Sequence, residues 1–354
     1  MVSIRPFEEH DNAAMLEIEK LCPQGNEQYA WGADRSPDII ARYKLYDNWK
    51  VLVAEDDGKI AGWVGWTIKH SPIKKEPYVY LAEIMVDPHF RRKGIATRLI
   101  REVEKNAQEI GSRYVYCYTF EPNDASKDLF KKLGFSHMED IKSHGLSVYK
   151  KAEVARNFVI ERINRTDIRD AVNLINNYYA GRPHFIPYTP ESFESYLNGI
   201  PAYGLENFWV VKENGKIVAC AGLWDYSILQ KMSMVKVPSS WKVMGVVFGF
   251  LGLFMKMPKI PAEGDIFKPQ FLTDHAFEQK KPDAMSNLIA YINNILIDAK
   301  RDVFVATQSS NDPIFEVTKK WNPSIDTFNF YAKPIAGELP PFRPLYFDIR
   351  DAIL

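Results

Sequence analysis

The sequence is poor in three features that would assign it to a specialised class of protein. It has only three cysteines, far apart and without a Cys-x-x-Cys pair, which excludes a disulfide scaffold, gives no zinc motif and suits a reducing compartment. Lysine plus arginine and aspartate plus glutamate number 45 each, so no positive excess favours a nucleic-acid partner. The N-terminus lacks an apolar run of signal-peptide length. We therefore expect a cytoplasmic protein with no metal site and no nucleic-acid partner.

Long apolar runs are also scarce, with one exception. The stretch "VMGVVFGFLGLFM" (243–255) carries no charge and lies in an expected helical insertion near 239–258. A membrane-spanning helix needs about 20 apolar residues, so we expect no transmembrane segment. A helix that is apolar on all sides must bury its surface. We favour a core or inter-domain helix; a homodimer contact, or an element that faces a membrane or lines an acyl-chain pocket, stays open.

Much of what is present occurs twice. Residues 48–68, "NWKVLVAEDDGKIAGWVGWTI", and 207–227, "NFWVVKENGKIVACAGLWDYS", both have an apolar strand, a charged turn ending in Gly-Lys-Ile and a second apolar strand. Turn residues between alternating apolar runs predict β-hairpins. A strand and a helix precede each hairpin. The repeat predicts two tandem α/β domains, residues 1–152 and 156–354, each a central mixed sheet flanked by helices.

A basic, glycine-containing loop occurs only in the first half. In "VDPHFRRKGIATRL" (86–99) it follows an apolar strand and precedes a helix with apolar residues at four-residue spacing. The start of a helix presents free N–H groups and a positive dipole end, which favour phosphate. Gly94 would let a ligand approach the backbone, and Arg91, Arg92 and Lys93 add positive charge. The loop predicts a pyrophosphate site, although a solvated basic turn has the same residues.

The second half lacks this loop. At the corresponding place it reads "FEQKKPDAMSN", which has no glycine and in which Pro282 predicts an ordinary helix start. We therefore expect a second domain that keeps the fold but not the phosphate site. It would shape the acceptor pocket of the first domain or serve only for folding, and we favour the pocket because ligand sites commonly form between domains.

Two motifs resemble the GCN5-related N-acetyltransferases (GNAT). "RRKGIA" matches their Arg/Gln-x-x-Gly-x-Gly/Ala pattern, and "NDASKDLFKKLGF", about 30 residues on, resembles their Asn-x-x-Ala-x-x-Leu-Tyr-x-x-x-Gly-Phe. The resemblance covers residues 1–150. The second motif also resembles, more weakly, the plant Hookless-type acetyltransferase-like proteins. A tandem chain with one degenerate half is similar to mycothiol-synthase-like proteins.

The resemblance implies acetyl-CoA as the cofactor, with its pyrophosphate on the backbone of residues 91–97. The residues implied to contact it are Met85, Val86, Arg91, Arg92, Lys93, Gly94, Ile95, Ala96, Thr97, Asn123, Ser126 and Phe130. Two of these depart from the family pattern, since Ser126 replaces the usual alanine and Phe130 the tyrosine that often acts as general acid. The acid therefore stays open between Tyr116, Tyr118 and release of the thiolate to water.

Glu83 is the candidate catalytic base. Strict alternation along "LAEIMVD" places Leu81, Glu83 and Met85 on one face of a strand, where partial burial would raise the pKa of the carboxyl group. Many family members carry the general base at this strand position. The alternative is a glutamate paired with a cation on the neighbouring strand.

These observations predict an acetyl-CoA-dependent N-acetyltransferase that transfers the acetyl group directly to a primary amine of a small molecule or peptide in a ternary complex. A second hypothesis is a catalytically silent CoA-binding sensor or interaction protein, because Phe130 has no proton to donate and the second half is degenerate. Aminoacyl transfer from tRNA fits poorly, since the loop is intact and the chain is not basic.

Overall fold

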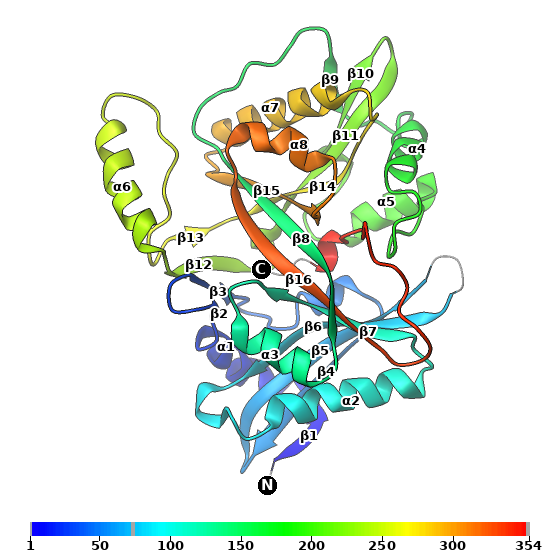
Figure 1. Cartoon of the computed structure of the whole chain (residues 1–354). Helices are drawn as coiled ribbons and strands as arrows, with labels where there is room; N and C mark the ends of the chain where they lie inside the picture. The colour runs from blue at the N-terminus through cyan, green and yellow to red at the C-terminus, as the bar shows by residue number, and fades with distance from the viewer. Residues whose placement is uncertain (1, 72–74, 352–354) are drawn as a thin grey trace.

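A 12-stranded mixed sheet runs through both halves of the chain in the computed structural model, which describes residues 2–71 and 75–351 (Figure 1). Its strands, in spatial order, are β1 (Ser3–Pro6), β4 (Trp49–Asp56), β5 (Lys59–His70), β6 (Pro77–Val86), β7 (Tyr114–Phe120), β16 (Ser324–Pro334), β8 (Ser136–Ser147), β15 (Val303–Ser309), β14 (Gln270–Phe277), β11 (Lys216–Asp225), β10 (Phe208–Glu213) and β9 (Val159–Arg162). The predicted α/β class with a central mixed sheet is confirmed.

A small second sheet and eight helices complete the described chain, apart from short 3-10 turns. The small sheet has the order β13 (Ile266–Phe267), β12 (Lys231–Lys236), β3 (Ala30–Asp34) and β2 (Gln24–Gly25). The helices are α1 (Asn12–Lys20), α2 (Ile95–Glu109), α3 (Asp124–Lys132), α4 (Ile168–Tyr178), α5 (Pro190–Gly199), α6 (Ser239–Leu251), α7 (Pro282–Asp298) and α8 (Ile314–Thr318). In the first half α1 and α2 pack on opposite faces of β5 and β6, and in the second half α4 and α7 do so on β11 and β14.

Both predicted hairpins form, and for the same local reason. The β4–β5 turn has Asp57 and Gly58 at φ 49° and 75°, and the β10–β11 turn has Asn214 and Gly215 at φ 50° and 80°. Two successive positive φ values are typical of the tight turn whose twist matches that of paired strands. The apolar stripe predicted for α2 is also confirmed, since Ile95, Leu99, Ile100, Val103 and Ala107 are buried.

The last strand of the first half, β8, and the last strand of the second half, β16, connect the two halves. β16, from the end of the chain, lies between β7 and β8, with Tyr331 opposite Cys117 and Phe330 opposite Glu139. β8, from the first half, pairs on its other edge with β15, where His144 lies opposite Ala306. Each closing strand is thus hydrogen-bonded to the other half of the chain. The division into domains 1–152 and 156–354 stays a prediction about the repeat, and the sheet is continuous across it.

This exchange of strands predicts one cooperative unfolding transition for the whole chain. Neither half can lose its sheet without breaking the β8–β16 pairing and exposing the edges of β7 and β15. Far-ultraviolet circular dichroism and tryptophan fluorescence should give the same midpoint in urea, with a slope that matches the surface exposed by all 354 residues. Two separate midpoints would contradict this expectation.

The apolar segment does not form a core helix, so that part of the favoured prediction is wrong. α6 projects from the body of the protein after β12 (Figure 1), and none of its residues is buried. Val246 is 76% exposed and Phe250 64% exposed. The physical reason is the small sheet: β12 pairs with β3 and β13 and directs the following chain outward, so only one side of α6 meets the protein. Across residues 2–71 and 75–351, no helix combines the length and apolar character needed to cross a bilayer.

Candidate active site

Two neighbouring strands of the first half separate at the centre of the site. β6 and β7 run parallel but pair only at Val79–Val115 and Tyr80–Tyr116. β6 then continues to Val86 with no further β6–β7 pair in the described chain. The backbone of β6 after Tyr80 therefore has one edge without a strand partner on the β7 side.

A β-bulge precedes this separation and changes the face on which side chains lie. β5 pairs Trp66 with Leu81 and Gly65 with Glu83, so Ala82 is an extra residue on β6. An extra residue bends the strand and shifts its alternation by one position. Leu81 consequently packs under α2, whereas Met85 packs on the opposite face with the core of α1. The prediction that Leu81, Glu83 and Met85 share a face is wrong for this reason.

Glu83 lies in a buried ion-pair network. Arg35 donates to both of its carboxylate oxygens, one at 2.8 Å, the hydroxyl of Tyr43 donates at 2.6 Å, and the indole N–H of Trp63 lies at 3.5 Å. Arg35 also donates to Glu19 of α1 at 2.5 Å. The side chains of Arg35 and Glu83 are 1% and 7% exposed.

This network sets the protonation of Glu83. Burial alone would raise the pKa of the carboxyl group, but the charge and hydrogen bonds of Arg35 outweigh burial, and the pKa lies below its ordinary value. The predicted rise in the pKa of Glu83 is therefore wrong. The arrangement resembles the alternative of an ion-paired glutamate, with the cation supplied by the segment after β3 rather than by a neighbouring strand.

The repeat extends into this network. Gly65 has no side chain, and a Cβ there would overlap the ring of Tyr43. In the second half, a Cβ at Gly222 would overlap the hydroxyl of Tyr203, which hydrogen-bonds to Thr273 on the bulged strand β14. Sequence reasoning missed Arg35 and Tyr43. The signal that could have indicated a close tyrosine is the glycine shared by the second strands of the two hairpins.

The predicted pyrophosphate loop is open at the start of α2. Gly94 is the N-cap residue at φ +76°, and a Cβ there would meet nothing within 4 Å. Among the described residues no side chain caps the first turn of α2. Arg91, Arg92 and Lys93 are exposed around it, and Arg91 also donates to the carbonyl oxygen of Val86 at 3.3 Å. Free amides with cations beside them fit a bound pyrophosphate.

The corresponding helix of the second half has no such opening. α7 begins at Pro282, as predicted, after Lys281, whose backbone is not helical (φ −129°, ψ 47°). Proline has no N–H to offer, Asp283 adds negative charge to the first turn, and Lys281 donates to Glu213 at 2.9 Å. The residues at this helix start do not fit a phosphate group.

The residues implied on α3 lie in two different environments. Asn123 caps the helix by accepting a hydrogen bond from the backbone N–H of Ser126 at 3.1 Å, and it donates to Gln24 of β2 at 3.2 Å. The side chains of Asn123 and Ser126 are partly exposed. Phe130, in contrast, is 1% exposed and packs against Phe135 in the core under α2. Phe130 therefore has no surface for the implied cofactor contact.

Comparison with known proteins assigns the chain to a protein family. The model of the acetyltransferase (GNAT) family matches residues 13–135. The aminoglycoside N(6')-acetyltransferase type 1 of Salmonella typhimurium is 30% identical over 98 residues, which are 27% of this chain and 68% of that protein. The chain belongs to the GNAT family of acetyltransferases.

Other relatives differ in how much of the chain they share. An uncharacterized N-acetyltransferase of Methanocaldococcus jannaschii is 35% identical over 92 residues, and the match covers 26% of this chain and 41% of that protein. The match thus spans less than half of that relative's length. The probable N-acetyltransferase HLS1 of Arabidopsis thaliana is 23% identical over 91% of this chain and 89% of its own length.

Solved structures share the fold over nearly the whole chain. A GCN5-related N-acetyltransferase from Sphaerobacter thermophilus has a TM-score of 0.64 at 11% identity, over 96% of this chain and 97% of its own. A tandem GNAT protein from the clavulanic acid biosynthesis pathway has a TM-score of 0.61 at 10% identity, over 96% and 100%. The prediction of a tandem GNAT protein is confirmed.

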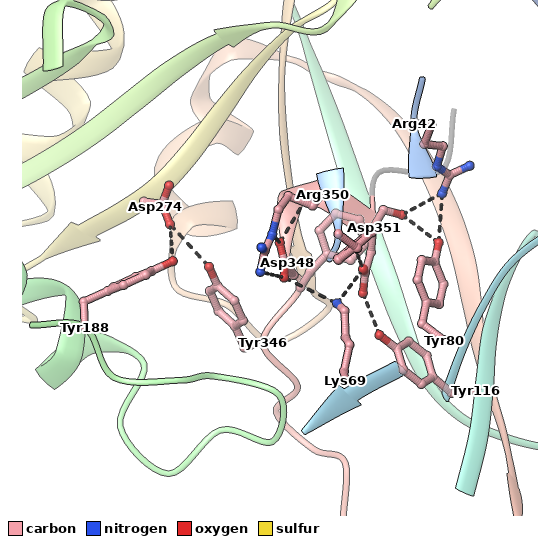
Figure 2. A network of polar contacts seen from close by, with 12 residues as sticks. Arg42, Lys69, Tyr80, Tyr116, Tyr188, Asp274, Tyr346, Asp348, Arg350 and Asp351 are labelled. Atoms are coloured by element: carbon pink, nitrogen blue, oxygen red, sulfur yellow. Dashed lines mark hydrogen bonds and ion pairs between the residues drawn. The ribbon is translucent and has the colours of Figure 1, made fainter. Parts of the chain in front are cut away.

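The segment that ends at Asp351 packs against tyrosines of β6 and β7. Sequence reasoning did not predict this contact. Figure 2 shows Asp351 accepting hydrogen bonds from Tyr116 at 2.8 Å and Lys69 at 2.6 Å, while Arg42 and Tyr80 donate to its backbone carbonyl. Burial raises the pKa of Tyr116 far above its ordinary value, and the same holds for Tyr118. A phenol whose pKa is raised is a weaker acid, so neither tyrosine suits the role of general acid in a GNAT reaction.

A second buried carboxyl group lies in the same network. Asp274 occupies a bulge of β14 at φ +45°, and Tyr188 and Tyr346 donate to it at 3.4 and 3.3 Å (Figure 2). Burial raises its pKa to about 6. Its second carboxylate oxygen has no hydrogen-bond partner within the described chain.

We expect Asp274→Asn to stabilise the protein at pH 8 and to change little at pH 4. The folded state holds the proton of Asp274 up to about pH 6 and the unfolded state only to about pH 4, so wild-type stability falls as pH rises through this range. Asparagine tolerates positive φ and cannot ionise, so it avoids a cost of about 3 kcal/mol. Urea midpoints at the two pH values test this. The same change at the exposed Asp298 should alter neither midpoint, and equal effects of both variants would contradict the expectation.

Proposed function

We propose that this GNAT-family acetyltransferase is an acetyl-CoA-dependent N-acetyltransferase that transfers the acetyl group directly to a primary amine in a ternary complex. The observation that carries the proposal is the open, uncapped start of α2, located after the strand β6 that separates from β7. The second half lacks this opening, so we propose one acetyl-CoA site per chain and a second domain that shapes the acceptor site.

The residues that would hold acetyl-CoA follow from this geometry. The backbone amides of residues 94–97 and the side chains of Arg91, Arg92 and Lys93 would bind the pyrophosphate. The unpaired edge of β6 at Met85 and Val86 would hold the pantetheine arm, and Asn123 and Ser126 at the start of α3 would also contact the cofactor. Bound acetyl-CoA would supply an acetyl thioester: the amine nitrogen would bond to its carbonyl carbon as the C–S bond breaks, and the departing thiolate would take its proton from water.

Glu83 is the proposed acceptor of the proton that the amine loses. It lies on β6 just beyond the last β6–β7 pair. Because its pKa is lowered, the carboxylate is ionised throughout the neutral range and stands ready in its basic form, although a lower pKa makes it a weaker base.

We expect Glu83→Gln to lower kcat about 100-fold while the affinity for acetyl-CoA stays unchanged. Glu19→Gln is a matched control, because Glu19 pairs with the same arginine but lies on α1 rather than on the separating strand. Both variants should lose similar stability in urea, and only Glu83→Gln should lose turnover. Equal kcat in the two variants would assign Glu83 to the ion pair alone.

Acetyl-CoA turnover against a panel of amines tests the proposed function. The full chain is incubated with acetyl-CoA and an aminoglycoside, an alkylamine or a peptide with a free amino terminus, and the release of free thiol is recorded. Amine-dependent release supports the proposal. Binding of acetyl-CoA without release for any amine would overturn it in favour of the CoA-binding sensor.

A further inference from the structure

A cavity of about 720 Å³ lies between α6 and the sheets. Its wall comes from the segment around β3, the end of β8, strand β12, helix α6 with the chain that follows it, β13, and the starts of β15 and β16. None of the residues proposed to contact acetyl-CoA lines it. Its volume lies within the range of about 300–1,000 Å³ that is typical of small-molecule sites.

The wall of this α6 cavity is apolar and adaptable. It contains four of the ten methionines of the chain, Met232, Met234, Met244 and Met257. Methionine side chains are flexible and polarizable, and they accommodate apolar groups of varied shape. Trp241 and Phe248 of α6 line the cavity. This side of the helix therefore adjoins apolar residues, whereas the opposite side is exposed. The wall therefore suits an apolar molecule of moderate size.

Two carboxylates line this wall, the exposed Asp302 and the half-buried Asp326. Asp326 accepts a hydrogen bond from the hydroxyl of Tyr29 at 3.1 Å, and no lysine or arginine in residues 2–71 and 75–351 forms an ion pair with it. Lys259, which also lines the cavity, pairs instead with Asp265 at 3.3 Å. Burial raises the pKa of Asp326 to about 6. A bound cation would offset the cost of keeping this carboxylate charged.

One residue of the wall, Trp31, has an unsatisfied donor, and the wall adjoins the proposed active site. The indole N–H of Trp31 is buried without a hydrogen-bond partner among the described residues. The rings of Trp31 and Tyr29 pack against Phe120, the last residue of β7, at 5.7 and 5.6 Å between centroids. The cavity wall thus rests on the end of the strand that separates from β6.

We propose that the α6 cavity binds an amphipathic primary amine, whose apolar body lies among the methionine and tryptophan side chains and whose ammonium group pairs with Asp326. The charge of the cavity selects the ligand class, since the carboxylate of Asp326, which has a hydrogen bond from Tyr29 but no ion-pair partner among the described residues, is complementary to an ammonium group and repels an anion. Binding of such an amine in the α6 cavity requires no acetyl transfer, so it can be measured without acetyl-CoA.

Three ligands with the same alkyl chain provide the first test. Dodecylamine, dodecanol and dodecanoate are titrated into the full chain below their micelle concentrations, followed by calorimetry and by fluorescence of Trp31, Trp241 and Trp321, which line the cavity. We expect one site per chain and at least about tenfold tighter binding of dodecylamine, which is protonated at neutral pH. Equal affinity for the three ligands, or binding at many sites, would overturn the proposal.

Substitutions in the wall of the α6 cavity test where the three ligands bind. Asp326→Asn should remove the preference for the amine and leave the affinity for dodecanol unchanged. Phe248→Ala should weaken all three ligands, whereas the control Phe250→Ala, on the 64% exposed side of the same helix, should weaken none. Equal effects of the two phenylalanine changes would mean adsorption to the outer face of α6 and would overturn the proposal. The three-ligand comparison on the unmodified protein decides the charge preference even if a variant folds poorly.

Discussion

Gly94→Glu should abolish binding of acetyl-CoA, with an affinity loss of at least about 100-fold. Gly94 is the N-cap of α2 at φ +76°, with open space where a Cβ would point. A glutamate there places negative charge at the positive end of the helix, where the pyrophosphate is proposed to bind. Its side chain also fills the space through which the ligand would approach the backbone amides. Titration calorimetry with acetyl-CoA measures the loss directly.

The same helix offers a matched control for this change. Gly111, beyond the other end of α2, has φ +67° and likewise nothing within 4 Å of a built Cβ. Gly111→Glu therefore introduces the same backbone strain and the same charge away from the proposed site. It should bind acetyl-CoA like the wild type. If Gly94→Glu also binds with unchanged affinity, the assignment of the pyrophosphate to this loop is wrong.

Arg35→Met should destabilise the protein by about 3–5 kcal/mol, because it leaves Glu19 and Glu83 buried without their cation. The side chains of Arg35 and Glu19 are each 1% exposed, and that of Glu83 is 7% exposed. Removing one partner of a buried ion pair costs far more than the pair contributes, since the remaining charges stay desolvated. Urea unfolding at pH 7 gives the change in the free energy of unfolding.

Two further variants separate this cause from a general packing defect. Adding Glu19→Gln and Glu83→Gln to Arg35→Met should recover much of the lost stability, because the buried negative charges are then gone. Arg113→Met removes a partly exposed arginine that pairs with Glu76 at 3.0 Å, and it should cost less than about 1 kcal/mol. A triple variant no more stable than Arg35→Met would contradict the electrostatic explanation.

The fold and the candidate site were predictable where their geometry depends on residues close together in the sequence. The turns at Asp57-Gly58 and Asn214-Gly215, the stripe of α2 and the opening at Gly94 each depend on residues within a few positions of one another. Hydrophobic periodicity, turn residues and helix-start chemistry act over this range. The closed helix start in the second half was predictable for the same reason, since Pro282 removes the N–H group locally.

The surroundings of Glu83 were not predictable in this way. One extra residue at Ala82 reversed the face of the strand, and no pattern in "LAEIMVD" marks it, since the bulge is defined only by pairing with β5. Arg35 lies 48 positions from Glu83 in the chain and reaches it because β3 packs against α1 and α1 packs against β5 and β6. That contact reversed the expected direction of the pKa shift.

The sequence by itself determined the repeated hairpins, the amphipathic helices and the single glycine-containing loop, because each follows from near neighbours along the chain. Only the tertiary structure decided the exchange of β8 and β16, the outward position of α6 and the burial of the C-terminal segment against Tyr116. These depend on which distant surfaces meet, and many pairings satisfy the same local pattern of apolar and polar residues. The apolar segment shows the difference: its composition required a partner surface, and the fold placed one side of it over a cavity.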